Sequence, residues 1–427
     1  MLSRSYSKLA VVLLPFLGCS SSSTSPGVSV DGGTDGSSSD AGTPTSLTIV
    51  EQESPTTPIP GAIMNLDYGD GTSELETAGA DGVVSFTSAS RASGVLDLSA
   101  GVAGRIVTTI MAPDLPKYES KGLQLTLRGA AATAVPLTGT ITNKNAPDDR
   151  LALSTTLPAT RFDQTLLTYS LKLPPNEPFT LVGTDYSSAG SGRSGAFTVN
   201  KWFHVDHAAL TGPTTFDIDV SAQAADTATT VSGTIVIPAA ASTSFKSTCK
   251  MTVTVYGVDL TKLAFTAQVG MFVTATLSAD QASFAYTAQY ITLPGITPFT
   301  ILELDASDGS GSQRILQGPP TDALTTSDFD VPLSIDATLG AGSTVDGTAV
   351  TDPTFLIVSA GSEAAWTVVL VPGKTSTLPT LPAAFKTIIG TAKLSGYLDT
   401  CSYFDADAGV PGVCTHQTFS KPATINL

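Results

Sequence analysis

The sequence predicts an all-β protein, built as tandem antiparallel β-sandwich domains after a disordered N-terminal tether. Apolar and polar residues alternate with a period of two along most of the chain, which is the pattern of strands with one buried face. The 38 Gly and 27 Pro residues recur between these runs as turn signals. No long segment has helical 3.6 periodicity, and 427 residues are enough for several domains.

The composition excludes some classes of protein. Lys and Arg number 21 against 37 Asp and Glu, which gives a formal net charge of −16. Affinity for nucleic acid comes mainly from basic side chains that neutralise phosphates, so no nucleic acid partner is expected. Hydrophobic residues make up 41% of the chain and can supply packed cores. No apolar stretch approaches the length of a spanning helix, so a polytopic membrane protein is excluded.

Residues 1–18 are typical of an export signal. Arg4 and Lys8 precede the apolar run Leu9 to Leu17, which is too short to cross a bilayer. The following sequence, Phe16-Leu17-Gly18-Cys19, resembles a bacterial lipobox, with Phe16 where Leu is usual. The resemblance implies lipidation of Cys19 and a membrane partner held through the lipid anchor. The alternative is an ordinary secretory signal with an incidental Cys.

Residues 19–46 are rich in Ser and Gly and nearly devoid of large apolar groups, which predicts a disordered tether. Ser20, directly after the Cys, resembles the residue found there in outer-membrane lipoproteins of double-membraned bacteria. This resemblance implies an extracytoplasmic protein anchored in the outer membrane.

Three further cysteines fit an oxidising compartment. Cys401 and Cys414 enclose a short loop rich in Gly, Pro and Asp, and we predict a disulfide between them, worth about 3 kcal/mol in the chain-entropy model. Cys249 is either free and buried or the true partner of one of the other two.

Several runs predict individual strands. The alternating apolar residues of these runs are Leu123, Leu125 and Leu127; Phe216, Ile218 and Val220; Met251, Val253 and Val255; and Phe329, Val331, Leu333, Ile335 and Ala337.

An internal repeat sets the domain organisation. The pattern of Leu173-Pro174 and Pro178-Phe179-Thr180-Leu181 recurs 120 positions later, from Leu293 to Ile301, and a Gly-Thr dipeptide followed by an apolar residue opens three segments, at Gly139, Gly233 and Gly347. The spacing predicts an insertion of about 26 residues in the third domain, near residues 250–265. We predict a signal peptide at 1–18, a tether at 19–46, and β-sandwich domains at 47–130, 131–228, 229–341 and 342–427.

The first of these domains resembles the carboxypeptidase regulatory-like, or transthyretin-like, family. The resemblance rests on Pro58-Ile59-Pro60-Gly61-Ala62-Ile63-Met64-Asn65-Leu66, Thr77 and Asp81-Gly82-Val83-Val84-Ser85-Phe86. Gly61 would let the chain turn into a strand, and Asp81-Gly82 would form a tight hairpin turn before Val84. Domains of this family are typically non-catalytic accessory modules.

No motif selects a reaction. His204 and Asp206 should share one face of a strand and His207 the other, which disfavours a metal site. Ca²⁺ could use the acidic turns at 67–71, 305–309 and 405–407, although Asp and Gly are also ordinary turn residues. A carbohydrate platform could use exposed aromatic residues, although we expect Trp202 and Trp366 to be core. The candidates for that platform are Tyr256, Tyr286, Tyr290, Trp202 and Trp366.

We therefore expect no enzymatic activity and no cofactor, and a structural or binding role in the cell envelope, with an envelope protein or a polysaccharide as partner. The alternative is a secreted or anchored hydrolase that acts on polysaccharide or peptide with carboxylates on its loops. A calcium-dependent adhesive module is a third hypothesis.

Overall fold

The computed structural model describes residues 45–51, 56–86, 95–113, 115, 122–125, 135–157, 162–164, 167–189, 195–259, 264–319, 325–326, 329–346, 354–361, 363–390, 393–403 and 414–427. It confirms the predicted fold class, since the described structure is 58% strand and 5% helix. No helix in these ranges is long and apolar enough to cross a membrane. Cys19 and the predicted signal and tether (residues 1–44) lie outside the described residues.

The strands fall into four consecutive units, which we name by their order in the chain. The first unit contains β1 (Thr45–Glu51), β2 (Ile63–Asp67), β3 (Ser73–Thr77), β4 (Val83–Phe86), β5 (Asp97–Gly101), β6 (Val107–Met111) and β7 (Leu123–Leu125). The second contains β8 (Val135–Thr142), β9 (Arg150–Thr155), β10 (Phe162–Gln164), β11 (Thr168–Leu173), β12 (Phe179–Ala189), β13 (Gly195–His207), β14 (Thr214–Thr215) and β15 (Ile218–Asp219).

The third unit contains β16 (Thr229–Val236), α2 (Thr243–Thr248), β17 (Lys250–Asp259), β18 (Ala264–Leu277), β19 (Ser283–Tyr290), β20 (Thr297–Asp305), β21 (Gly311–Gln317) and β22 (Thr325–Thr326). The fourth contains β23 (Thr338–Gly340), β24 (Thr344–Asp346), β25 (Thr354–Ala360), β26 (Glu363–Leu370), β27 (Thr375–Thr377), α3 (Ala383–Ile389), β28 (Leu394–Tyr403), β29 (Cys414–Phe419) and β30 (Ala423–Asn426).

All four units share most of one pairing scheme, and the third and fourth add pairs between their two sheets, β18 with β19 and β28 with β30. In the first unit, β1 pairs antiparallel with β4 and parallel with β7, while β2 pairs with β3 and β5, and β5 with β6. The second unit repeats this with β8, β11 and β14–β15 in one sheet and β10-β9-β12-β13 in the other. The third does so with β19-β16-β22 and β18-β17-β20-β21. The fourth splits the opening strand, so that β24 pairs with β27 and β23 with β30, beside the sheet β26-β25-β28-β29.

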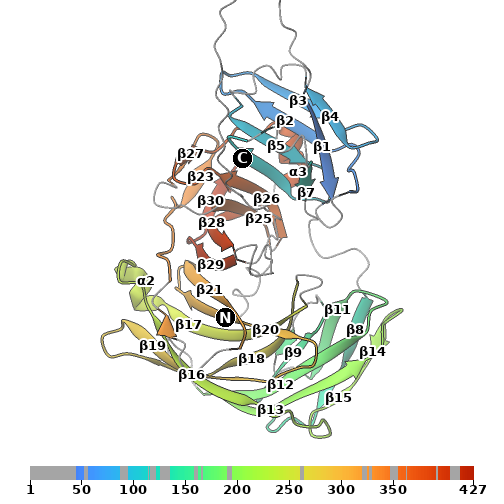
Figure 1. Ribbon diagram of the computed structural model, residues 1–427, viewed down its shortest axis with the longest axis vertical. Coiled ribbons are helices and arrows are strands. Elements are labelled where there is room, and N and C mark those ends of the chain that lie inside the picture. Colours follow the sequence, from blue (N-terminus) through green and yellow to red (C-terminus); the bar gives the residue numbers. More distant parts are fainter. Residues whose placement is uncertain are drawn as a thin grey trace, which may run out of the picture.

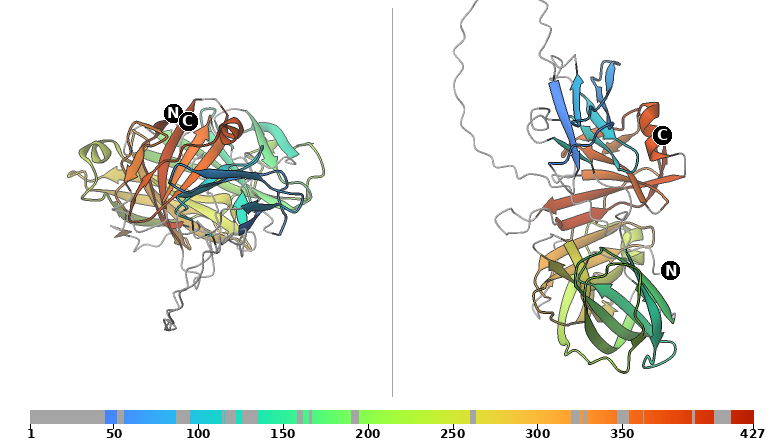
Figure 2. Two further views of the ribbon diagram at one scale, coloured as in Figure 1. Left: turned by 90° about the horizontal axis from the view of Figure 1, so that it is seen from above. Right: turned by 90° about the vertical axis from the view of Figure 1, so that its right-hand side faces the viewer.

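The larger sheets of the four units are joined edge to edge. β6 of the first unit pairs parallel with β26 of the fourth, from Val107 opposite Trp366 to Ile110 opposite Val369. β29 of the fourth pairs antiparallel with β21 of the third, and β18 of the third meets β13 of the second at two residue pairs. The spatial order of the units is therefore first, fourth, third, second. Figure 1 and the right-hand view of Figure 2 show the blue and red strands of the first and fourth units above the green and yellow strands of the other two.

Each unit has its own buried hydrophobic cluster, and a fifth cluster joins two units. The four unit cores are centred on Leu66, Leu171, Phe284 and Leu356. In the fifth cluster Val182 and Trp202 of the second unit pack with Val255 and Val269 of the third. Neighbouring units therefore share apolar contacts as well as strand hydrogen bonds.

The Gly-Thr signal has a steric cause at its first occurrence. A Cβ on Gly139 of β8 would lie 1.9 Å from the carbonyl oxygen of Phe216, because the chain of β14 and β15 runs close beside β8. The phenol of Tyr169 donates a 2.6 Å hydrogen bond to the same carbonyl oxygen. Only glycine fits this crossing without a shift of the backbone.

Two local predictions are wrong. Residues 329–337, predicted as a strand, pair with no neighbouring strand and form the link from β22 to β23; Pro332 lacks an amide donor there, and Val331 is 41% exposed. Asp81-Gly82 does form a tight turn, with Gly82 at φ 73° and the Val83 amide donating to Asp81 Oδ1. This turn does not close a hairpin, because β4 crosses to the other sheet and pairs with β1.

The described residues also include two short helices, α2 and α3. In α2 the Ser242 hydroxyl accepts a 3.1 Å hydrogen bond from the Phe245 amide, which caps the helix start. α2 lies between β16 and β17, and the long β17–β18 pair follows it. α3 lies against β5 and β6, where a Cβ on Gly101 would touch Phe385.

Candidate functional site

The two histidines of the Lys201 to His207 segment lie on opposite faces of β13, as predicted. His204 and Asp206 are exposed on the outer face, whereas His207 lies on the core side between two aromatic rings. The His207 ring stacks on Phe179 at 5.0 Å and meets Phe216 edge-on at 4.4 Å. Burial lowers the pKa of His207, and the nearby Asp206 carboxylate acts in the opposite direction.

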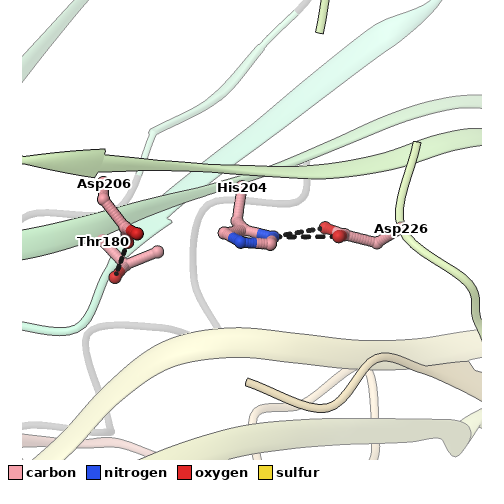
Figure 3. A network of polar contacts seen from close by, with 4 residues as sticks. All are labelled: Thr180, His204, Asp206 and Asp226. Carbon is pink, nitrogen blue, oxygen red and sulfur yellow. Dashed lines mark hydrogen bonds and ion pairs between the residues drawn. The ribbon is translucent and has the colours of Figure 1, made fainter. Parts of the chain in front are cut away.

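The His204 ring forms a hydrogen bond with the carboxylate of Asp226, shown in Figure 3. Its Nδ1 lies 2.9 Å from Oδ1 and 3.0 Å from Oδ2 of the carboxylate. Asp226 belongs to the link between β15 and β16, and its amide donates a 2.8 Å hydrogen bond to the Trp202 carbonyl of β13. This bond holds the carboxylate beside the ring, at a partly exposed position where ion pairs add little to stability.

Thr180 and Asp206 form a second polar contact on the same face (Figure 3). The two residues are direct ladder partners on β12 and β13, and the Thr180 hydroxyl donates to Asp206 Oδ1 at 2.7 Å. We name Thr180, His204, Asp206 and Asp226 the polar strip. It carries hydrogen-bonding groups of both kinds on a flat sheet surface.

The polar strip contains a histidine paired with a carboxylate, as the general base of a hydrolytic site often is, but the described residues place no nucleophile beside it. Among the described residues no hydroxyl or thiol bonds to His204, and the Thr180 hydroxyl is committed to Asp206. A small hollow lies in the fourth unit, beside Trp366, Leu381 and Lys386. A hydrolytic site of the nucleophile–base kind would place a hydroxyl or thiol within hydrogen-bond distance of the histidine ring.

A buried acidic pair in the second unit escaped sequence reasoning. Asp149 and Asp185 are 4% and 1% exposed and lie near the loop that joins β8 to β9. The pKa of Asp185 is raised overall, mainly because the carboxyl group is buried. The hydrogen bond from the Asn145 amide acts against this rise, the charge of Asp149 adds to it, and the charges of Lys144 and Lys201 reduce it. Asp149 Oδ2 accepts from the Ala146 amide at 2.7 Å and from Asn200 at 2.9 Å. This network ties the β8–β9 loop to β12 and β13.

The acidic turns bond mainly to their own backbones. Asp70 accepts hydrogen bonds from the amide and hydroxyl of Thr72, and Asp308 accepts them from those of Ser310. No group of three or more His, Cys, Asp or Glu residues in the described part of the chain could hold a metal ion. The turn at 405–407 lies outside the described residues.

The aromatic candidates do not form an exposed platform. Trp202 and Trp366 are 3% and 2% exposed, which confirms that they are core, and Tyr256 and Tyr286 are also buried. Tyr290 is half-buried and packs against two of the core clusters.

The cysteines are partly placed. Cys249 is free and buried in the core of the third unit. Cys401 and Cys414 belong to neighbouring strands, β28 and β29, but their side chains lie outside the described residues, so their disulfide stays a prediction.

Comparison with known proteins gives only distant similarity. No family model matches the chain, and no curated protein matches it. A putative adhesin from Bacteroides ovatus has 9% identity over 48% of this chain and 98% of its own, with a TM-score of 0.17. A family 26 carbohydrate-binding module from Eubacterium rectale has 9% identity over 58% and 99%, with a TM-score of 0.15. The mixed-linkage glucan protein SGBP-B from Bacteroides ovatus has 11% identity over 69% and 63%, with a TM-score of 0.13. Similarity at this level supports no inference about function.

Proposed function

We propose that this protein is a non-catalytic surface protein of the cell envelope, anchored in the outer membrane by a lipid on Cys19. Its four units would act as one rod that holds the second unit away from the bilayer and presents it to a binding partner. The continuous sheet is the observation that carries the proposal. Because each seam consists of backbone hydrogen bonds, the units cannot swing independently as beads on linkers do.

The order of the units supports this arrangement. The first unit follows the predicted tether, and the second stands at the other end of the joined sheets (Figure 1). The polar strip is on β12 and β13 of that second unit, with His204 38% exposed. Its carboxylates and imidazole suit a ligand rich in hydroxyl groups, and we propose a polysaccharide as the partner.

The anchor is tested by the mature N-terminus. Mass spectrometry of protein extracted from whole cells should find an acylated Cys19 as the first residue, and cell fractionation should place the chain with the outer membrane. The Cys19→Ala variant should lose the acyl mass and leave the membrane fraction. An unmodified N-terminus at another residue would overturn the anchor.

The binding role is tested on a glycan array with the detergent-extracted full chain. We expect retention on at least one polysaccharide, weakened at least tenfold by His204→Ala combined with Asp226→Ala. Asp280→Asn is the matched control, since Asp280 is an exposed turn residue of the third unit whose carboxylate accepts from the Ala282 amide. Capture of an envelope protein instead, with no glycan retained, would refute the polysaccharide and leave the anchored rod in place.

A further inference from the structure

A second polar cluster lies where the first unit meets the fourth. Asn65 and Asp67 occupy one face of β2, and Asp97 and Ser99 occupy the same face of β5, because residues two apart in a strand point the same way. Asp67 is the direct ladder partner of Asp97, and Asn65 that of Ser99. Ser99 is also opposite Thr109 on β6. These side chains therefore form one compact group across three strands.

This group is buried because the fourth unit covers a face that would otherwise be solvent-exposed. Met64, Leu66 and Leu98, on the opposite face, pack into the core of the first unit. On the face of the polar group, Met111 and Trp366 belong to the core of the fourth unit. Asp97 is 1% exposed and Asn65 4%, whereas Asp67, at the end of β2, is partly exposed and gives access from solvent.

The donors available to the group reach only one oxygen of Asp97. Trp366 Nε1 donates to Thr109 Oγ1 at 2.9 Å, and Thr109 and Ser99 share a 2.9 Å hydrogen bond. The Ser99 hydroxyl then donates to Asp97 Oδ1 at 3.4 Å.

Two buried oxygens beside this chain have no donor. Asp97 Oδ2 and Asn65 Oδ1 are both buried without a hydrogen-bond partner. A buried acceptor left unpaired costs about 1–3 kcal/mol, and more if it is charged. The two oxygens are therefore available to a ligand that offers positive charge or a hydrogen-bond donor.

The carboxylates of Asp67 and Asp97 also favour a positively charged ligand. Two carboxylates directly opposite each other on neighbouring strands repel. Within the described ranges no Lys, Arg or His side chain bonds to Asp67 or Asp97.

We propose that Asn65, Asp67 and Asp97 bind a divalent cation, Ca²⁺, at the junction of the first and fourth units. Ca²⁺ takes carboxylate and amide oxygens and completes its shell with water, whereas this group lacks the nitrogen and sulfur ligands of Zn²⁺ or Cu²⁺. With few protein ligands, the affinity belongs in the millimolar range of extracellular calcium modules. The cation would neutralise both carboxylates and stiffen the junction. The site does not depend on the lipid anchor.

The first test measures the thermal unfolding of the full chain in EDTA and in millimolar Ca²⁺. Because the cation binds only the folded state, the wild type should melt about 3 °C higher with Ca²⁺. Asp97→Asn and Asp67→Asn should each abolish this shift while the chain remains folded. Asp81→Asn, in an exposed turn of the same unit, is the matched control and should keep the full shift.

The second test locates the ion. Tb³⁺ takes the oxygen sites of Ca²⁺, and its luminescence is sensitised by a nearby tryptophan. The chain has two tryptophans: Trp366 is linked to Asp97 through Thr109 and Ser99, and Trp202 is in the second unit. Trp366→Phe should remove most of the sensitised emission, Trp202→Phe should preserve it, and Ca²⁺ should displace Tb³⁺ from the wild type.

Three results would overturn the proposal: a wild-type melting temperature that Ca²⁺ does not change, a shift that persists in Asp97→Asn, or Tb³⁺ emission that Trp202→Phe reduces as much as Trp366→Phe does. Calcium binding with an unmodified Cys19 would refute the anchor alone. An acylated Cys19 without calcium binding would refute the cation site alone.

Discussion

The indole of Trp366 donates a 2.9 Å hydrogen bond to the hydroxyl of Thr109, 257 positions earlier in the chain. The two residues lie on β26 and β6, the strands that join the fourth unit to the first. This bond fixes the large Trp366 side chain within the core of the fourth unit and places its polar edge against the sheet of the first. One hydroxyl at this junction therefore has a defined partner, although its sequence context is that of an ordinary strand threonine.

Replacing that hydroxyl should weaken the junction. Thr109→Val keeps the volume and removes the acceptor, which leaves the buried indole N–H unpaired at a cost of about 1–3 kcal/mol. Chemical denaturation followed by tryptophan fluorescence measures the loss. Thr109→Ser, which retains the hydroxyl, should lose less; equal losses in the two variants would contradict the role of the bond.

Gly82 should be required for both its backbone conformation and its small size. It adopts φ 73°, and a Cβ there would lie 2.7 Å from Pro58 Cβ and 2.8 Å from the Ile49 carbonyl oxygen. Gly82→Ala should therefore cost about 2 kcal/mol or more. Gly61→Ala is the control, since Gly61 has φ 71° but nothing within 4 Å, and should cost about 1 kcal/mol. Urea unfolding of both variants checks the difference, and equal costs would show that crowding at Gly82 is unimportant.

The buried Asp97 should make the chain more stable in mild acid when Ca²⁺ is absent. Its pKa is raised from 3.8 to about 7, so between these values the folded state binds more protons than the unfolded state. Stability therefore falls as pH rises from about 4 to about 7. Melting curves in EDTA should show this slope in the wild type and a flatter one in Asp97→Asn. Identical slopes would indicate that Asp97 titrates normally.

His207 should have the opposite dependence. Because burial lowers its pKa in the folded state, the unfolded chain takes up a proton first as the pH falls below about 6.5, and stability is lost. His207→Phe keeps an aromatic ring beside Phe179 and Phe216 and should remove this acid sensitivity. His204→Asn, on the exposed face, should retain it. Hydrogen exchange of β12 and β13 as a function of pH reports on the second unit itself, and unchanged acid sensitivity in His207→Phe would count against this assignment.

Sequence periodicity could predict the strands, but not what their outer faces contact. The alternation of Met251, Val253 and Val255 predicted a buried strand face because that pattern is local. The segment Leu96-Asp97-Leu98-Ser99 has the same alternation and suggests that Asp97 faces water. It faces the fourth unit instead, whose residues follow more than two hundred positions later.

The repeat was visible because Phe179 and Phe299 occupy equivalent buried positions in β12 and β20. The strand pairings between units could not be predicted from the sequence. Every strand edge offers the same backbone N–H and C=O groups, so no residue type shows which strand an edge pairs with. In the candidate site, the alternation of side chains along a strand correctly predicted that His204 and His207 lie on opposite faces of β13. The pairing of His204 with Asp226 did not follow from it, because Asp226 lies in a link without periodicity.

The spatial order of the units has a consequence for biogenesis. The chain leaves the ribosome in sequence order, so β6 is made long before β26, the strand that covers its edge. Until the last ninety or so residues arrive, newly made protein exposes a bare sheet edge that could recruit another copy. Termination before β26 would leave that edge, and the edge of β21, permanently open to self-association.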